Sequence, residues 1–256
     1  MKLTTIRTRG GTRAARAEGD GTLVELPWPD VGTALRDPRW RSVAGSAAGC
    51  SHEAMFSTRA PLVLSPGRIL CVGRLSRTAS WLPVTLAGSR DAIFPPPGAD
   101  ADCETHLAVV LGAPLHRGSE AAAAAAIAGF SILTAITTST HGTLSFGPAL
   151  ATPDELPGGV RPRVVLREIV DGALVREAPT AGLDPVDVLR RLSHAVPLQP
   201  GDVIAVGVPG GPRRHLGERC VLETEIDEIG FQENELRQPV QEIESRVDRR
   251  ARTGPA

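Results

Sequence analysis

The sequence has 256 residues, of which 41% are apolar and 22% charged, so one large domain can bury a substantial core. Its formal net charge of -1 shows no basic excess, which argues against a nucleic-acid or anionic-membrane partner. The chain has no tyrosine, and its only lysine is Lys2. A tyrosine acid, a buried Schiff-base lysine and a P-loop lysine are therefore excluded.

The first 65 residues show weak patterning, with short apolar pieces such as residues 22–26 standing between Gly, Pro and Arg. We expect a small N-terminal α/β domain over residues 1–65, in which residues 42–51 form a loop or a weak helix. Residues 1–18 lack the apolar segment of a secretory signal. No run approaches the roughly 20 apolar residues of a membrane span. We therefore expect a cytoplasmic protein without membrane contact.

The hydrophobic pattern of the sequence becomes clearer from residue 66 onward. Residues 69–72, 107–111 and 130–136 have the continuous apolar character of buried strands. The alanine-rich segment 119–129 predicts a helix with a serine N-cap and a glycine stop. The four cysteines are scattered without C-x-x-C spacing, which favours free buried thiols over zinc ligands or disulfides.

The second half of the chain predicts more strands than helices. Residues 164–170 and 173–175 flank an Asp-Gly turn, the signature of a hairpin. Residues 185–195 predict an amphipathic helix, and residues 202–206 and 221–226 predict strands. From Gln232 the charges alternate, which indicates a marginal helix or a disordered tail. We expect a strand-rich, mixed α+β main domain over residues 66–235 and a tail over residues 236–256.

Four segments carry a recognisable pattern: residues 68–73 (RILCVG), 104–112 (ETHLAVVLG), 147–155 (GPALATPDE) and 199–210 (QPGDVIAVGVPG). In this order they resemble the fumarylacetoacetate hydrolase family over roughly residues 65–235. The resemblance implies a mixed β-roll core and a homodimer. It also implies a small-molecule substrate, a β-dicarbonyl or enol-carboxylate compound that is cleaved, decarboxylated or isomerised with a divalent metal.

The positions that carry the family's chemistry differ in this chain. By the resemblance, the family's two metal-binding glutamates correspond to Glu104 and His106, and its metal-binding aspartate to Ala135. Ala79 and Leu82 stand where the family has its water-activating histidine and glutamate. One carboxylate and one imidazole are poor ligands for Mg²⁺, which prefers six oxygen ligands. We therefore expect no metal ion and no other cofactor.

Glu104 and His106 are the candidate catalytic residues. They are two positions apart, so on a strand their side chains share one face. A histidine with a near-neutral pKa is a natural general base, and such a pair can take a proton alpha to a carbonyl. In the alternative interpretation, Glu104 pairs with an arginine and His106 fills the space left by the metal.

Candidate substrate-binding residues lie in three segments near this pair in the family frame: Arg74, Arg77, Thr134, Thr137, His141, Gly207, Val208 and Gly210. The arginines offer forked hydrogen bonds to a carboxylate or enolate. The threonine-rich run can orient a polar ligand, and the glycine-rich turn can offer backbone N–H groups to an oxyanion. Each segment also has a purely structural interpretation. The arginines can be ordinary surface charges, the threonines can serve as strand formers, and the glycines can form a tight turn.

The leading hypothesis is a metal-independent enzyme of specialised metabolism, such as antibiotic biosynthesis. It would be a cyclase, isomerase or lyase that acts on a carbonyl-rich, polyketide-like substrate through an enol or enolate. A first alternative is a non-catalytic binding or partner subunit. A second is a metal-dependent C–C hydrolase, decarboxylase or isomerase of a β-dicarbonyl acid.

Overall fold

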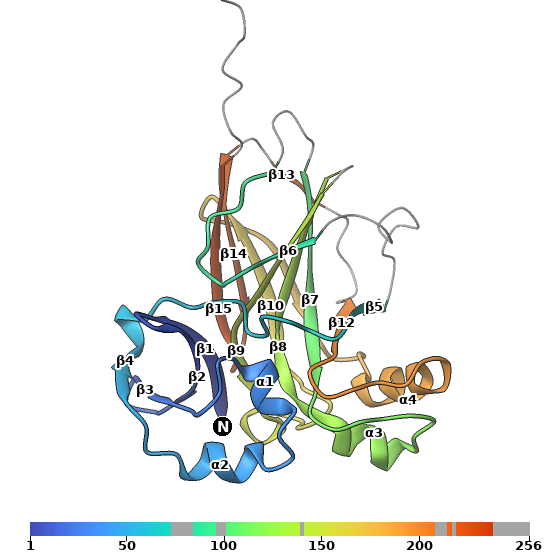
Figure 1. Ribbon diagram of the computed structural model, residues 1–256. Helices are drawn as coiled ribbons and strands as arrows, with labels where there is room; N and C mark the ends of the chain where they lie inside the picture. Colours follow the sequence, from blue (N-terminus) through green and yellow to red (C-terminus); the bar gives the residue numbers. More distant parts are fainter. Residues whose placement is uncertain (73–83, 96–100, 139–140, 208–213, 217–218, 238–256) are drawn as a thin grey trace, which may run out of the picture.

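The computed structural model describes residues 1–72, 84–95, 101–138, 141–207, 214–216 and 219–237, where strands outnumber helices (Figure 1). The strands are β1 Lys2–Thr8, β2 Gly11–Ala17, β3 Thr22–Glu25, β4 Ser51–Glu53, β5 Ile69–Val72, β6 Val84–Ala87, β7 Ala101–Leu111, β8 Ile127–Thr137, β9 Gly142–Ala151, β10 Val165–Val170, β11 Ala173–Pro179, β12 Val203–Gly207, β13 Arg214–Leu216, β14 Arg219–Ile226 and β15 Gly230–Arg237. The helices are α1 Val31–Leu35, α2 Trp40–Ser46, α3 Glu120–Ala126 and α4 Pro185–Ala195, with short 3₁₀ turns η1 Ala54–Phe56 and η3 Pro153–Glu155. The predicted strand-rich α+β class is confirmed.

Two sheets make up the described part of the chain. The larger has eleven strands there, with a main path in the order β4-β3-β2-β1-β9-β8-β7-β12-β5. Strand β13 pairs with β7, and β6 pairs with β9. The smaller sheet has the order β11-β10-β14-β15. Strand β7 lies between β8 and β12, so both its edges are hydrogen-bonded.

The N-terminal strands form an antiparallel series that continues the larger sheet. Strand β1 meets β9 through Lys2 opposite Ala151 and Leu3 opposite Leu150. Residues 2–17 therefore form two strands, whereas their sequence showed only weak patterning. The pattern was weak because a polar residue such as Thr4 occupies a buried strand position. Its hydroxyl donates a hydrogen bond to Pro148 O at 2.7 Å, which allows the burial. The domain boundary at residue 65 stays a prediction.

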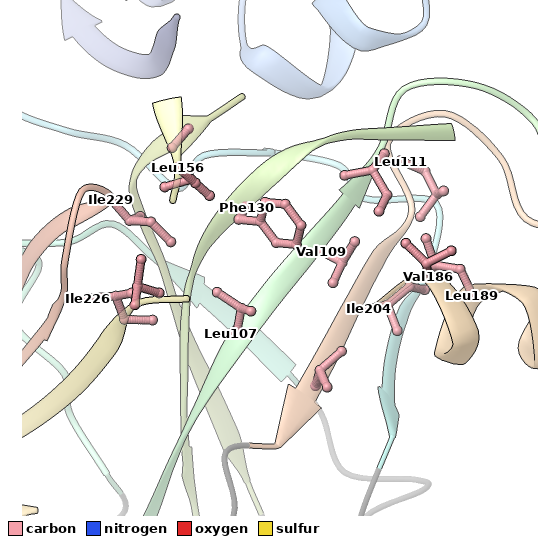
Figure 2. Close-up of a cluster of buried hydrophobic side chains, with 14 of the residues drawn as sticks. Leu107, Val109, Leu111, Phe130, Leu156, Val186, Leu189, Ile204, Ile226 and Ile229 are labelled. Carbon is pink, nitrogen blue, oxygen red and sulfur yellow. The ribbon is translucent and has the colours of Figure 1, made fainter. Parts of the chain in front are cut away.

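The main hydrophobic core lies between the two sheets and under α4. Leu107 and Val109 of β7 project toward Phe130 of β8 and Ile226 of β14, as Figure 2 shows. The opposite face of β7 contributes Ala108 and Val110 to a second cluster, which also contains Trp40 of α2. Side chains of β7 thus alternate between two buried faces, as the period of a strand requires.

Several predicted element boundaries differ from the structure, and in two cases a strand stands where the sequence predicted a helix or a disordered tail. The helix expected over residues 119–129 begins after its Ser119 N-cap as predicted but ends at Ala126, and Gly129 lies inside β8. That glycine is required by close packing, since a Cβ there would lie 2.4 Å from Ala151 O. The segment from Gln232 onward was expected to be a marginal helix or disordered. Its residues up to Arg237 belong to strand β15, where Gln232 and Asn234 are buried.

The hairpin and helix α4 that the sequence predicted are both present in the structure. Strands β10 and β11 flank the Asp171–Gly172 turn, and both turn residues have positive φ. Helix α4 begins at Pro185, and the Asp184 carboxylate accepts hydrogen bonds from Val186 N and Asp187 N, each at 3.1 Å. None of the helices in the described ranges has the length and apolarity of a membrane span.

All four cysteines are free, as expected. Cys103 and Cys220 are buried and Cys71 is partly buried. Cys50 is exposed, which corrects the expectation that all four thiols are buried.

Candidate functional site

Glu104 and His106 lie together on one face of β7. Their side chains approach to 3.9 Å between His106 Nε2 and Glu104 Oε2. The predicted shared face is therefore present in the structure.

Neighbours of different size flank this pair on the adjacent strands. Glu104 lies opposite Ala135 of β8, and His106 lies between Leu133 of β8 and Gly207 of β12. Directly opposed residues share a face, so a methyl group stands beside Glu104, and a leucine side chain and a glycine stand beside His106. Among the predicted substrate-binding residues that the structure describes, Gly207 is in register with His106.

His106 is almost completely buried, with 2% of its surface exposed. Within the described part of the chain, neither ring nitrogen has a hydrogen-bond partner. Burial lowers the pKa of His106 to about 4, and the positive charge of Arg176 adds to the shift. The ring is therefore neutral at pH 7, which corrects the expectation of a near-neutral pKa.

Two unpartnered nitrogens on a buried ring are costly. An unsatisfied buried polar atom destabilises a fold by about 1–3 kcal/mol. Buried groups of this kind are rare in folded proteins and frequently mark functional positions. His106 is thus the side chain in this region that most clearly lacks a structural explanation.

Arg176 of β11 is a functional candidate that the sequence did not reveal. Its guanidinium forms an ion pair with Glu168 of β10 at 3.3 Å, and both side chains are largely buried. A bulge between Glu168 and Ile169 shifts the hairpin register and places Arg176 opposite Glu168. A two-residue turn without a bulge would have placed Val175 there, so the pairing could not be read from spacing.

Cys71 of β5 has a thiol whose ionisation is strongly perturbed. Burial raises the pKa of its thiol to about 11, and the negative charge of Glu104 contributes. The thiol stays protonated at pH 7 and is therefore a weak nucleophile. The structure therefore gives Cys71 no nucleophilic role in this state.

Thr134 lies on the other face of the sheet from the candidate pair. Its hydroxyl is 3.4 Å from that of Thr105, the β7 residue between Glu104 and His106. It also donates to Gln232 Oε1 at 3.2 Å, toward the smaller sheet. The hydroxyl therefore joins the two sheets, and the structure does not bring Thr134 together with the candidate catalytic pair.

Thr137 and His141 lie beyond the pair, near the end of β8. Thr137 is opposite Asp102, one row further along β7 on the face that carries Glu104. His141 Nε2 is 3.1 Å from the Thr85 hydroxyl of β6. The remaining predicted binding residues fall outside the described ranges, and their roles stay predictions: Arg74, Arg77, Val208 and Gly210.

The donor set at this position does not suit a hard divalent ion. In the ranges that the structure describes, no group of three or more His, Cys, Asp or Glu side chains is placed to hold a metal. The residue across from Glu104 is Ala135, whose methyl group has no ligand atom. One carboxylate and a neutral imidazole fall well short of the six oxygens that Mg²⁺ or Mn²⁺ prefers.

Comparison with known proteins identifies a family profile and structural neighbours. The profile for the fumarylacetoacetate (FAA) hydrolase C-terminal domain matches residues 80–237. No curated protein matches the chain. Among solved structures, fumarylacetoacetate hydrolase from Exiguobacterium antarcticum is 20% identical with a TM-score of 0.77, covering 93% of this chain and 100% of that one.

Two further neighbours show which activities occur on this fold. The 5-carboxymethyl-2-hydroxymuconate delta-isomerase from Mycobacterium smegmatis is 22% identical with a TM-score of 0.74, covering 93% of this chain and 100% of that one. The maleylpyruvate hydrolase from Sphingobium sp. SYK-6, in complex with manganese(II) and pyruvate, is 20% identical with a TM-score of 0.74. That match covers 93% of this chain and 99% of the neighbour.

Proposed function

Because this chain belongs to the fumarylacetoacetate hydrolase family, we propose that it is an enzyme acting on a carbonyl-rich small molecule through an enol or enolate. The reaction class is isomerisation, cyclisation or elimination, and the substrate is a polyketide-like or related acid. The neighbours named as isomerase and hydrolase support chemistry on small acids. We further propose that the reaction needs no resident divalent metal.

The observation that carries this proposal is the unpartnered, buried His106 ring beside Glu104. A neutral imidazole has one N–H donor and one acceptor nitrogen. A substrate carbonyl oxygen can accept from the N–H, and this hydrogen bond strengthens as negative charge develops on the oxygen. The ligand would thereby satisfy a nitrogen that lacks a partner in the described chain.

Glu104 takes the role of base. Its side chain is 28% exposed, so a small ligand can reach the carboxylate, and His106 Nε2 lies 3.9 Å from the same carboxylate. The carboxylate accepts a proton from the carbon alpha to the carbonyl, and the C–H electron pair forms the C=C bond of the enolate. Isomerisation is completed when that proton, or one from solvent, returns to a different carbon.

Solvent exchange tests these roles without knowledge of the natural substrate. Pyruvate and maleylpyruvate are incubated with the protein in D₂O, and the loss of alpha-proton signals is followed by NMR. The wild type is expected to accelerate exchange of at least one acid. Glu104→Gln should slow that exchange by about 100-fold or more, the usual contribution of a general base.

Matched variants separate the two roles from a general loss of structure. His106→Leu should also slow exchange by about 100-fold, since it removes one donor to the enolate oxygen. Glu53→Gln, on the exposed edge strand β4, removes the same charge as Glu104→Gln and should exchange like the wild type. Equal rates for all four proteins would refute the assignment, and binding of these acids without exchange would favour a non-catalytic protein.

A further inference from the structure

The smaller sheet presents one of its two faces to solvent. Along β14 and β15, buried residues alternate with residues that are partly or fully exposed. Two large apolar side chains lie on the exposed side, Phe231 of β15 at 37% exposure and Leu174 of β11 at 57%. Phe231 is opposite Glu225, and Leu174 is in one row with Ile169 and Glu223. These residues belong to the face that points away from the core, which we call the outer face.

Two glutamates stand side by side on the outer face. Glu223 of β14 is directly opposite Glu233 of β15. Like charges in this position destabilise a sheet. Within the part of the chain that the structure describes, no ion pair or side-chain hydrogen bond engages either carboxylate. A cationic group between them would remove the repulsion.

The other carboxylates of this region share few arginines. Arg167 of β10 pairs with Glu177 at 2.9 Å, with Glu225 at 3.7 Å and with Asp227 at 2.6 Å. One guanidinium carries a single positive charge, so this group of four side chains keeps a net negative charge. The other ion pairs of the face join Arg219 and Arg237 to Glu235. Carboxylates therefore outnumber guanidinium groups, and the outer face is acidic.

The segment that follows β15 has the opposite charge. Residues 246–252 (RVDRRAR), which lie outside the described ranges, hold four arginines and one aspartate. Strand β15 ends at Arg237, and residues 238–245 can span up to about 26 Å when extended. Glu233 precedes Arg237 by four residues in the strand, a distance of about 14 Å. The segment is therefore close enough along the chain to return over the outer face.

We propose that the arginine-rich segment 246–252 docks on the outer face of the smaller sheet of its own chain. Its guanidinium groups pair with Glu223 and Glu233 and relieve the repulsion between them. Covering the exposed Phe231 ring adds apolar burial. The covalent link raises the effective concentration of the segment, so weak contacts are sufficient. The surface uses neither Glu104 nor His106, and the inference does not depend on the proposed function.

Limited digestion of the full chain with trypsin tests the docking, because trypsin cleaves after arginine and a docked segment is protected. The rate of cleavage within residues 246–252 is followed by mass spectrometry. Glu223→Gln/Glu233→Gln should be cleaved there about fivefold faster than the wild type, as expected when weak exposed ion pairs are lost. In about 0.5 M sodium chloride the two rates should become equal, because salt screens exposed charges.

Two further variants separate docking from a general change of structure. Asp20→Asn/Glu53→Gln removes the same two charges from the turn before β3 and from the edge strand β4, and should be cleaved like the wild type. Arg249→Gln/Arg250→Gln leaves the sheet intact and should speed cleavage after Arg252 by a similar factor. Circular dichroism melting checks that each variant is folded.

Protein concentration identifies which chain supplies the segment. Equal protection at about 1 µM and about 100 µM protein supports docking within one chain, which does not depend on concentration. Protection that develops only at the higher concentration would assign the segment of a second copy and would overturn the proposal. Equal low-salt cleavage rates after Arg252 in the wild type and in Arg249→Gln/Arg250→Gln would overturn it as well, as would equal rates in the wild type and in Glu223→Gln/Glu233→Gln.

Discussion

Lowering the pH from 7.5 to 5 is expected to remove about 2 kcal/mol from the free energy of unfolding through His106 alone. The pKa of this ring is about 4 in the folded protein and 6.5 in the unfolded chain. Between these values the unfolded chain binds a proton that the folded protein does not. The stability is therefore complete above pH 6.5 and falls as the pH drops toward 4. Each pH unit in this window costs about 1.4 kcal/mol, which gives the stated loss at pH 5.

Urea unfolding followed by tryptophan fluorescence measures this effect at both pH values in the wild type and in His106→Leu. Other groups titrate equally in the two proteins, so the leucine variant should lose about 2 kcal/mol less on acidification. At pH 7.5 the variant should be as stable as the wild type or more stable by about 1–3 kcal/mol, because the unpartnered nitrogens are gone. Identical acid losses in both proteins would refute the inference that His106 is buried and uncharged.

Three further substitutions test the framework around the site. Gln232→Leu should lower the free energy of unfolding by about 1–3 kcal/mol, because the Gln232 amide donates to Gly147 O at 3.0 Å; an unchanged urea midpoint would contradict this. Asp184→Ala removes the N-cap of α4 and should lower the free energy of unfolding by about 0.5–2 kcal/mol, again measured by urea unfolding. A variant as stable as the wild type would show that the cap is dispensable. Gly129→Ala should give little folded protein by circular dichroism, since its Cβ would lie 2.4 Å from Ala151 O. A native spectrum and melting temperature would mean that the strands can separate at low cost.

Elements with strong local signals could be predicted from the sequence. Helix α4 combines an N-cap, a proline at its first position and amphipathic spacing, and its predicted bounds match the structure. The hairpin of β10 and β11 follows from its Asp171–Gly172 turn. In both cases the information lies within a few residues, so the rest of the chain was not needed.

Strands that bury polar side chains could not be predicted in this way. Gln232 and Asn234 of β15 look like surface residues in the sequence, yet both are buried against the larger sheet. They tolerate burial because backbone carbonyls accept their amide protons, and Asn234 Nδ2 donates to Gly88 O at 3.0 Å. Those acceptors lie far away in the sequence, so only the tertiary structure reveals them.

The candidate site was partly accessible to sequence reasoning. The shared face of Glu104 and His106 follows from the period of a strand, whereas the opposite facing of Thr134 depends on its register with Thr105. The pKa of His106 depends on burial and on Arg176, which a β-bulge brings into position. Neither the burial of His106 nor the β-bulge that positions Arg176 has a signal in the local sequence.

The most direct test of the central claim is alpha-proton exchange in metal-free buffer with EDTA, followed by addition of Mn²⁺. The predicted donor set, one carboxylate beside a neutral imidazole, should give the same exchange rate in both conditions. A rate that is absent in EDTA and restored by one equivalent of Mn²⁺ would contradict the claim that this member of the family works without a resident metal.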